Sequence, residues 1–378
     1  MTERELPTPF FIVYEDRLRA NLELISRVSR ESGADIIMAF KANALWRTFD
    51  IVREYCRNCT ASSVNELLLG AEYMGGEIHS FTPAYTDANI DTFLRLSSHI
   101  TFNSLSQYNR FAAKTAQSAA SAGLRVNPKC SVIETDLYNP ALPGSRFGVD
   151  ASALSDGVPA GVEGLHFHAL CESSSYDLER VLEAFESQYG HLLPGLKWVN
   201  MGGGHLMTRE GYDTDHLVRL LSDFRRRHPN IKVILEPGSA FTWRTGELLT
   251  SVVDVVSNDG IDTAIIDASF ACHMPDTLEM PYKPLITESL GPDTVPGKPT
   301  YRLGGNSCLS GDYKDAWSFD RPLRAGNRLT LEDMNHYTTV KTTMFNGLDH
   351  PSIWLERADG SLEELRRYTY EDYRSRMS

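Results

Sequence analysis

The lysine at position 41 follows a short apolar segment, and that position suits it for chemistry. Residues 35–40 read Asp-Ile-Ile-Met-Ala-Phe, and a continuous apolar run is typical of a strand that is buried on both faces. Lys41 then stands at the C-terminal end of the strand. A lysine removed from water has a lowered pKa, and its neutral amine can form a Schiff base. The alternative is a buried aliphatic stem with the ammonium group in solvent.

Two further segments could bind parts of a cofactor. Residues 201–205 read Met-Gly-Gly-Gly-His, and such glycines let the backbone come close to an anion such as phosphate; a plain flexible loop is the alternative. Glu236 ends the apolar segment Val-Ile-Leu-Glu and precedes Pro-Gly. Its carboxylate could hold the protonated nitrogen of a pyridine ring, and a structural ion pair is the alternative.

An imidazole completes this set of residues. In the segment Leu-His-Phe-His-Ala-Leu, residues 165–170, strand alternation would direct Phe167 one way and His168 the other. His168 could then stack on an aromatic ring, whereas His166 is expected to be a core histidine. A Schiff-base lysine, a phosphate loop, a carboxylate and a stacking imidazole together suit pyridoxal 5'-phosphate (PLP).

The elements that position these residues alternate along the first 240 residues. Eight strands are predicted in alternation with helices, and this order favours a closed (β/α)8 barrel of the TIM type; an open doubly wound sheet is the alternative. The strands are expected at 35–40, 60–63, 77–82, 99–103, 124–127, 164–170, 198–201 and 232–236. The helices are expected at 16–32, 51–56, 64–74, 88–96, 105–122, 176–189 and 215–227. Active sites of such barrels lie at the C-terminal strand ends, where Lys41, Ser62 or Ser63, His168 and Glu236 fall.

The pattern changes near residue 241. Short strand-like segments broken by Gly, Pro and Asp predict a C-terminal all-β domain resembling a β-sandwich or a β-barrel, which the apolar strand 10–14 is expected to join. We therefore expect a barrel domain at 12–240 and a β-rich domain made of residues 1–11 plus 241–378. The segments are 248–256, 263–266, 329–331, 338–345 and 352–356, with a charged helix at 363–376.

Composition excludes several classes of protein. The formal net charge of −13 argues against nucleic acid and anionic membranes as partners, since both require a basic surface. No apolar run is long enough for a membrane helix or a signal core. Six cysteines without a secretory signal indicate free thiols and a cytoplasmic location. Cys56 and Cys59 have zinc-knuckle spacing but no second ligand pair, so no metal is expected.

Longer motifs resemble one enzyme family. The chain resembles the alanine-racemase-like, fold-type III PLP enzymes over nearly its whole length, and within them the carboxynorspermidine/carboxyspermidine decarboxylase branch. The motifs are Phe40-Lys-Ala-Asn43, His168-Ala-Leu-Cys-Glu172, Gly202–Gly204, Glu236-Pro-Gly238, Cys272-His-Met-Pro-Asp-Thr-Leu-Glu-Met-Pro281, Ser307-Cys-Leu-Ser-Gly-Asp312 and His336-Tyr-Thr-Thr-Val-Lys-Thr-Thr-Met-Phe-Asn-Gly347.

This resemblance implies a role for each matching residue. Lys41 would form the Schiff base with PLP, His168 would stack on its ring, and Glu236 would bind the ring nitrogen. The phosphate would be held by Gly203, Gly204 and Tyr337, and Arg146 would support Lys41 or the cofactor. Cys308 would return a proton to the α-carbon across the interface of a homodimer with shared active sites. Asp276 and Asp312, together with Glu236, would bind the substrate.

The resemblance therefore implies decarboxylation of carboxynorspermidine or carboxyspermidine in polyamine biosynthesis. Decarboxylases of this fold that act on diaminopimelate usually carry arginine after Glu-Pro-Gly, whereas this chain has Ser239. The alternatives are a decarboxylase for diaminopimelate, ornithine or arginine, and a non-catalytic PLP-binding regulator. A glycosidase barrel is disfavoured because no pair of acids stands at the strand ends.

Overall fold

The computed structural model describes residues 3–133, 135–280 and 282–378. Residues 1 and 2, which were assigned to the β-rich domain, and Pro281, which ends one motif, lie outside these ranges. The chain divides into two compact units. One consists of Ala20–Phe241, and the other of the residues up to Arg19 together with Thr242–Ser378. The division therefore falls within the first helix, whereas we had expected it at residue 12.

The unit Ala20–Phe241 is built on parallel strands. They pair in the order β2-β10-β9-β8-β7-β6-β5-β4-β3. Their bounds are β2 Asp35–Ile36, β3 Met38–Ala39, β4 Cys59–Ala61, β5 Ile78–Phe81, β6 His99–Phe102, β7 Ser121–Arg125, β8 Val162–His166, β9 Trp198–Asn200 and β10 Lys232–Leu235. Only Ile37 separates β2 from β3, and these two halves of one strand pair with β10 and β4 respectively. The sheet thus returns to its first strand, which confirms the (β/α)8 barrel and excludes the open sheet.

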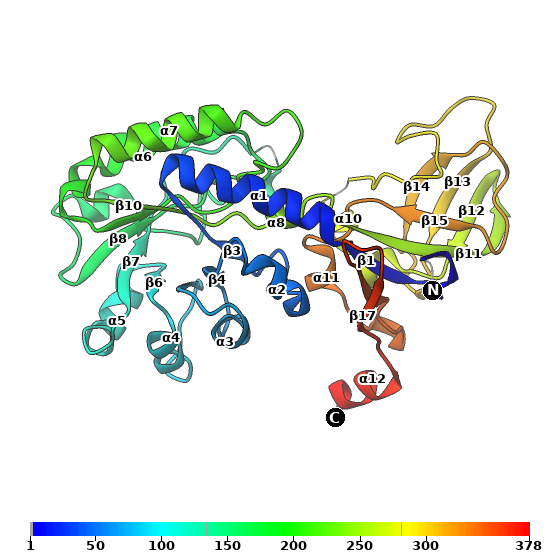
Figure 1. Cartoon of the computed structure of the whole chain (residues 1–378), viewed down its shortest axis with the longest axis horizontal. Coiled ribbons are helices and arrows are strands. Elements are labelled where there is room, and N and C mark those ends of the chain that lie inside the picture. The colour runs from blue at the N-terminus through cyan, green and yellow to red at the C-terminus, as the bar shows by residue number, and fades with distance from the viewer. Residues whose placement is uncertain (1–2, 134, 281) are drawn as a thin grey trace. The chain divides into compact units, whose positions relative to one another are not determined.

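Helices connect the barrel strands. Figure 1 shows α3, α4 and α5 side by side, and the same holds for α6 and α7. Serine N-caps start several of them: Ser63 accepts a hydrogen bond from Glu66 N, and Ser174 forms a capping box with Asp177. The bounds are α1 Glu15–Ser32, α2 Phe49–Val52, α3 Val64–Tyr73, α4 Ile90–Leu96, α5 Leu105–Thr115, α6 Ser175–Tyr189, α7 Thr214–Arg227 and α8 Ser239–Thr242. Short 3-10 helices of this unit lie at Trp46–Thr48, Asp136–Tyr138, Ala151–Leu154 and Gly190–Gly195, and those of the second unit lie at Glu3–Glu5 and Phe345–Gly347.

Trp198 fills part of the barrel interior, and two glycines make room for it. Trp198 is 2% exposed and packs with Ile37 and Ile234. A Cβ atom at Gly123 would lie 2.2 Å from its ring, and one at Gly164 would lie 2.0 Å from it. A side chain at either position would therefore displace the tryptophan from the core.

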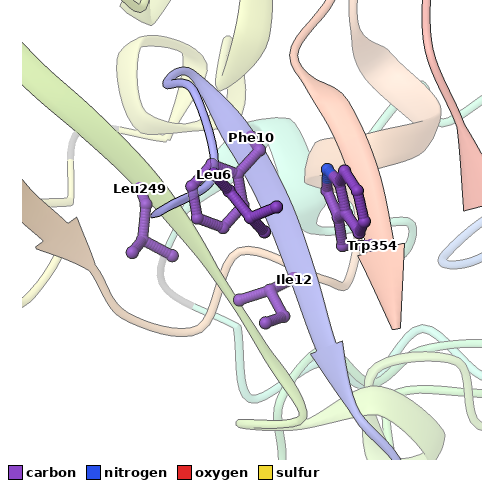
Figure 2. Close-up of a cluster of buried hydrophobic side chains, with 5 residues drawn as sticks. All are labelled: Leu6, Phe10, Ile12, Leu249 and Trp354. Atoms are coloured by element: carbon purple, nitrogen blue, oxygen red, sulfur yellow. The ribbon is translucent and has the colours of Figure 1, made fainter. Parts of the chain in front are cut away.

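The second unit is built on a mixed sheet of eight strands in the order β14-β13-β12-β11-β1-β16-β17, with β15 pairing to β11. As expected, β1 joins this sheet, antiparallel to β11 and parallel to β16. Figure 2 shows the buried cluster that holds it there: Leu6, Phe10, Ile12, Leu249 and Trp354. The bounds are β1 Phe10–Tyr14, β11 Gly246–Asn258, β12 Ile261–Ile266, β13 Thr300–Gly304, β14 Tyr313–Ser318, β15 Arg328–Leu331, β16 Ser352–Glu356 and β17 Leu362–Arg366, with helices α9 Phe270–His273, α10 Asp276–Glu279, α11 Thr338–Lys341 and α12 Tyr370–Met377.

Several predicted elements are wrong in type or extent. The helix expected at 51–56 ends at Val52, and the strand expected at 164–170 ends at His166. The helix expected at 105–122 ends at Thr115, because residues 121–125 pair with β6 and β8 as a strand. The segment expected as a strand at 338–345 instead begins with the helix α11, which follows the N-cap Tyr337. The helix expected at 363–376 is a strand up to Arg366, since the edge of β16 offers it hydrogen-bond partners.

Strands β13 and β14 were not predicted. In addition, no helix within the described ranges combines the length and the apolarity that crossing a membrane requires.

Candidate active site

A cavity of about 700 Å³ lies at the C-terminal ends of the barrel strands. Its floor contains Lys41 after β3, Arg125 at the end of β7, His166 at the end of β8, and Glu236 after β10. The loop between β7 and β8 supplies one wall through residues 136–140 and 142–147. The strand ends therefore bring together Lys41, His168 and Glu236, as the barrel topology predicted.

Lys41 is held next to His168. Its Nζ lies 3.5 Å from His168 Nε2, and its side chain is exposed to the cavity rather than covered by other side chains. The surrounding barrel wall separates the ammonium group from bulk water and lowers the pKa of Lys41, and the nearby positive charge of Arg125 lowers it further. A lower pKa increases the fraction of neutral amine, which is the form that attacks a carbonyl carbon.

The backbone determines the tautomer of His168. Gly203 N donates a hydrogen bond of 2.7 Å to His168 Nδ1, so Nδ1 carries no proton. Burial, with the charges of Lys41 and Arg125, lowers the pKa of His168 well below its usual value, and the ring is therefore neutral. The single ring proton then resides on Nε2, facing Lys41.

Glu236 is anchored by Asn200. The carboxylate is 8% exposed, and its Oε1 accepts a hydrogen bond of 2.7 Å from Asn200 Nδ2. Asn200 Oδ1 in turn accepts one of 2.8 Å from Gly202 N. Asn200 thus fixes the carboxylate relative to the glycine loop. The other carboxylate oxygen, Oε2, lies 3.8 Å from His166 Nε2.

Arg125 is a buried cation beside the lysine. Its guanidinium lies 4.6 Å from the ring centroid of Phe81 and 4.2 Å from that of Phe147, and it donates a hydrogen bond of 3.3 Å to His168 O. Burial lowers the pKa of Arg125 to about 9, although the charge of Glu236 opposes this effect. Arg146, the arginine that the resemblance indicated, also lines the cavity, but it is exposed and stacks on Phe147 at 4.3 Å.

The glycine loop is closely packed, so it is not a flexible linker. Gly202 and Gly204 have φ values of 70° and 89°, and a Cβ atom at Gly203 would lie 2.4 Å from Glu236 O. The Gly203 N–H is committed to His168. Within the described ranges, no protein group accepts a hydrogen bond from the Gly204 N–H, which leaves this donor for an anion such as phosphate.

The other predicted site residues belong to the second unit. Cys308 is exposed, and its backbone N–H donates a 2.7 Å hydrogen bond to Asn346 Oδ1. Tyr337 caps α11. Asp276 Oδ1 accepts a hydrogen bond of 2.7 Å from Lys341 Nζ. The roles of these residues stay predictions.

Asp312 is only 4% exposed. Its carboxylate accepts hydrogen bonds from four donors: Ser269 Oγ, Ala271 N, Ser307 N and Ser307 Oγ. These bonds hold the segment before Cys308 against α9. Its predicted role in binding the substrate stays a prediction.

Sequence reasoning missed Arg125 and Asn200, and it misplaced His166. All three end an observed strand, since Arg125 ends β7, His166 ends β8 and Asn200 ends β9. They lie inside the predicted strands 124–127, 164–170 and 198–201, however, so the predicted bounds did not mark them as strand ends. His166 is not a core histidine with satisfied nitrogens: it lines the cavity, and neither ring nitrogen has a hydrogen-bond partner in the described part of the chain.

These residues fit PLP by the chemistry of their groups. The cavity is lined by an amine of lowered pKa, a buried carboxylate for a pyridinium nitrogen and a neutral imidazole. The adjacent glycine loop contributes the Gly204 N–H, which has no acceptor among the described residues. The fold and the site therefore define a (β/α)8-barrel protein with a PLP site and a second, sheet-containing unit.

The comparisons with known proteins agree with this class. Residues 11–335 match the family model described as "Pyridoxal-dependent decarboxylase, C-terminal sheet domain". The chain is 44% identical to carboxyaminopropylagmatine decarboxylase of Synechocystis sp., an alignment that covers 98% of this chain and 96% of that protein. It is 39% identical to carboxynorspermidine/carboxyspermidine decarboxylase of Campylobacter jejuni over 99% of both chains. A crystal structure of the C. jejuni carboxynorspermidine decarboxylase, complexed with norspermidine, superposes with a TM-score of 0.90 at 38% identity and covers 98% of this chain and 100% of that chain.

The chain belongs to the PLP-dependent decarboxylase family of ornithine, diaminopimelate and arginine decarboxylases. It is an enzyme, and PLP is its cofactor. The non-catalytic regulator is excluded.

Proposed function

We propose that this enzyme decarboxylates the amino-acid end of a carboxylated polyamine. The relatives that span its full length are named for carboxynorspermidine, carboxyspermidine and carboxyaminopropylagmatine. All three compounds share one amino-acid group and differ in the cationic tail attached to it. The sequence resemblance indicated the first two, and the Synechocystis relative adds the third. The observation that carries the proposal is the cavity in which Lys41, His168 and Glu236 converge.

PLP, when bound, withdraws the electron pair that remains on the α-carbon after carbon dioxide has left. Lys41 would hold the cofactor covalently, because its lowered pKa supplies a neutral amine. Glu236, held by Asn200, would keep a proton on the pyridine nitrogen, because a buried carboxylate stabilises an adjacent positive charge. His168 would cover one face of the ring with its neutral imidazole and so exclude water from that face.

The proton that replaces carbon dioxide requires a donor, and we assign this role to Cys308. Cys308 is exposed on the second unit. In a homodimer, the Cys308 thiol of one copy would reach the barrel cavity of the other copy. Tyr337 and Gly204 would hold the phosphate, and Arg146 would support the cofactor at the mouth. The free thiols are consistent with a cytoplasmic enzyme.

The distal cationic groups of the substrate require acidic partners. We propose that Asp276 and Asp312 of the second unit bind these cationic groups, and that Glu236 contacts the substrate near its reacting end. Lys341 already binds Asp276 and also contacts Glu279, so a substrate ammonium or guanidinium group would compete with the lysine for these carboxylates.

Diaminopimelate carries a distal carboxylate, and the chain offers no arginine for it at the position after Glu236-Pro-Gly. Ser239 stands there as the first residue of α8. This uncharged residue favours a substrate with a distal cation over a dicarboxylic amino acid.

The test measures carbon dioxide release with added PLP from carboxynorspermidine, carboxyspermidine, carboxyaminopropylagmatine and meso-diaminopimelate. We expect turnover of one or more of the first three, and their order ranks the tails. Lys41→Ala should abolish both the turnover and the absorbance of the bound cofactor while the protein stays folded. Turnover of diaminopimelate alone would refute the proposed substrate class, and a fully active Lys41→Ala variant would refute the role of the lysine.

A further inference from the structure

The N-terminal end of the barrel, away from the cofactor cavity, carries a cluster of three potential metal ligands. Glu77 precedes β5, His79 lies within β5, and His99 begins β6. The parallel register pairs His79 with His99, so their side chains lie next to each other on the same face of the sheet. One ligand atom of each of the three residues lies within 4.8 Å of the other two.

One buried nitrogen of this cluster is not hydrogen-bonded to any described residue. His79 is 3% exposed, and within the described residues its Nε2 has no hydrogen-bond partner. This atom points toward Glu77, at 3.8 Å from Oε2, which is too far for a hydrogen bond. A buried polar atom without a partner is costly and calls for an explanation, and an unoccupied ion position is one of the few available.

We propose that Glu77, His79 and His99 bind a divalent transition-metal ion of the Zn²⁺ type. Two imidazole nitrogens and one carboxylate are a usual donor set for Zn²⁺ and leave a fourth position for water. Imidazole nitrogens disfavour Mg²⁺ and Ca²⁺, which prefer oxygen ligands. The side chain of Glu77 is 45% exposed, so the ion can enter from solvent without passing through the barrel.

Lys232 opposes the ion, and this opposition makes the proposal testable. Lys232 Nζ lies 2.9 Å from Glu77 Oε2 and 2.9 Å from Asp35 Oδ2. The two imidazole rings are stacked, with centroids 4.1 Å apart and planes at 20°. Metal binding therefore requires the rings to turn until their nitrogens converge, and Glu77 to release Lys232, which retains Asp35. Removal of the lysine charge should then tighten binding.

The experiment is a Zn²⁺ titration of the tag-free holoenzyme by calorimetry, with the Tm measured alongside. We expect about one ion per chain and a rise in Tm, since a ligand that binds only the folded state stabilises it. Glu77→Gln and His79→Phe should weaken binding by more than the roughly 10- to 100-fold that loss of an outer-shell partner costs. Lys232→Met should strengthen binding. His191→Gln is the matched control, because this exposed histidine lies outside the cluster, and its binding should be unchanged.

Equal Zn²⁺ affinity in the wild type and Glu77→Gln would overturn the proposal, because the ion would then be bound elsewhere, for example on the exposed thiol of Cys308. Absence of binding by the wild type and by Lys232→Met would overturn it as well. Glu77 is half-exposed at the rim, so Glu77→Gln keeps the test valid even if His79→Phe fails to fold.

Discussion

Replacement of Asn200 by leucine should weaken PLP binding and destabilise the barrel together. Asn200 is 1% exposed, and leucine has a similar size and shape, so the change removes polar contacts rather than volume. It deletes the hydrogen bond to Glu236 Oε1 and leaves Gly202 N without its acceptor. The carboxylate then stays buried with one partner fewer and is free to turn.

The magnitude follows from these two bonds. A hydrogen bond to a charged group contributes about 1.5–3 kcal/mol, and a buried donor without a partner costs about 1–3 kcal/mol. Asn200→Leu should therefore lower the free energy of unfolding of the apoenzyme by about 2.5–6 kcal/mol, a large part of the roughly 5–15 kcal/mol of an ordinary domain. If the change also weakens the free energy of PLP binding by about 1.4 kcal/mol, the Kd for PLP rises about tenfold.

Urea unfolding of the apoenzyme and a PLP titration monitored by absorbance measure the two effects separately. The control is Asn89→Leu, since Asn89 Oδ1 accepts a comparable hydrogen bond of 2.8 Å from Thr86 N but lies outside the cavity. It should cost about 1 kcal/mol and leave PLP affinity unchanged. Wild-type PLP affinity in a folded Asn200→Leu enzyme would show that Glu236 does not depend on this anchor.

Two further predictions concern the second unit. Burial lowers the pKa of His273 from 6.5 to about 4, so below pH 6.5 the unfolded chain takes up a proton that the folded protein excludes, and the folded state loses stability as the pH decreases. Between pH 7 and pH 5 the free energy of unfolding of the wild type, measured by urea titration, should fall by roughly 2 kcal/mol more than that of His273→Gln. Equal losses in the two proteins would contradict this assignment. Phe10 is fully buried in the cluster of Figure 2, so Phe10→Ala should lower the free energy of unfolding by about 3–5 kcal/mol; a loss below about 1 kcal/mol would mean that β1 contributes little to this core.

The sequence by itself determined the chemistry of the cofactor site. Lys41, His168 and Glu236 stand at the ends of predicted strands, and parallel strands of a closed barrel all end on the same side. Positions along the chain were therefore enough to predict that these residues converge. The motifs were equally informative about the family, because they are long and nearly free of gaps.

The position of strand β7 required tertiary contacts. Residues 116–122 are mostly small and suit a helix as well as a strand, so local preference could not place its start. The pairing of Ser121 with His99, and the fit of Trp198 against Gly123, decide in favour of the strand. These partners are far apart in the sequence, and no window of local pattern contains both of them.

The hydrogen bonds inside the site were likewise decided only by the folded chain. Asn200 reaches both Glu236 and Gly202, and the N–H of Gly203 binds His168 instead of remaining free for phosphate. A sequence shows which groups can donate or accept, but the pairing depends on distances of about 3 Å. Such distances arise only when strands β8, β9 and β10 lie side by side.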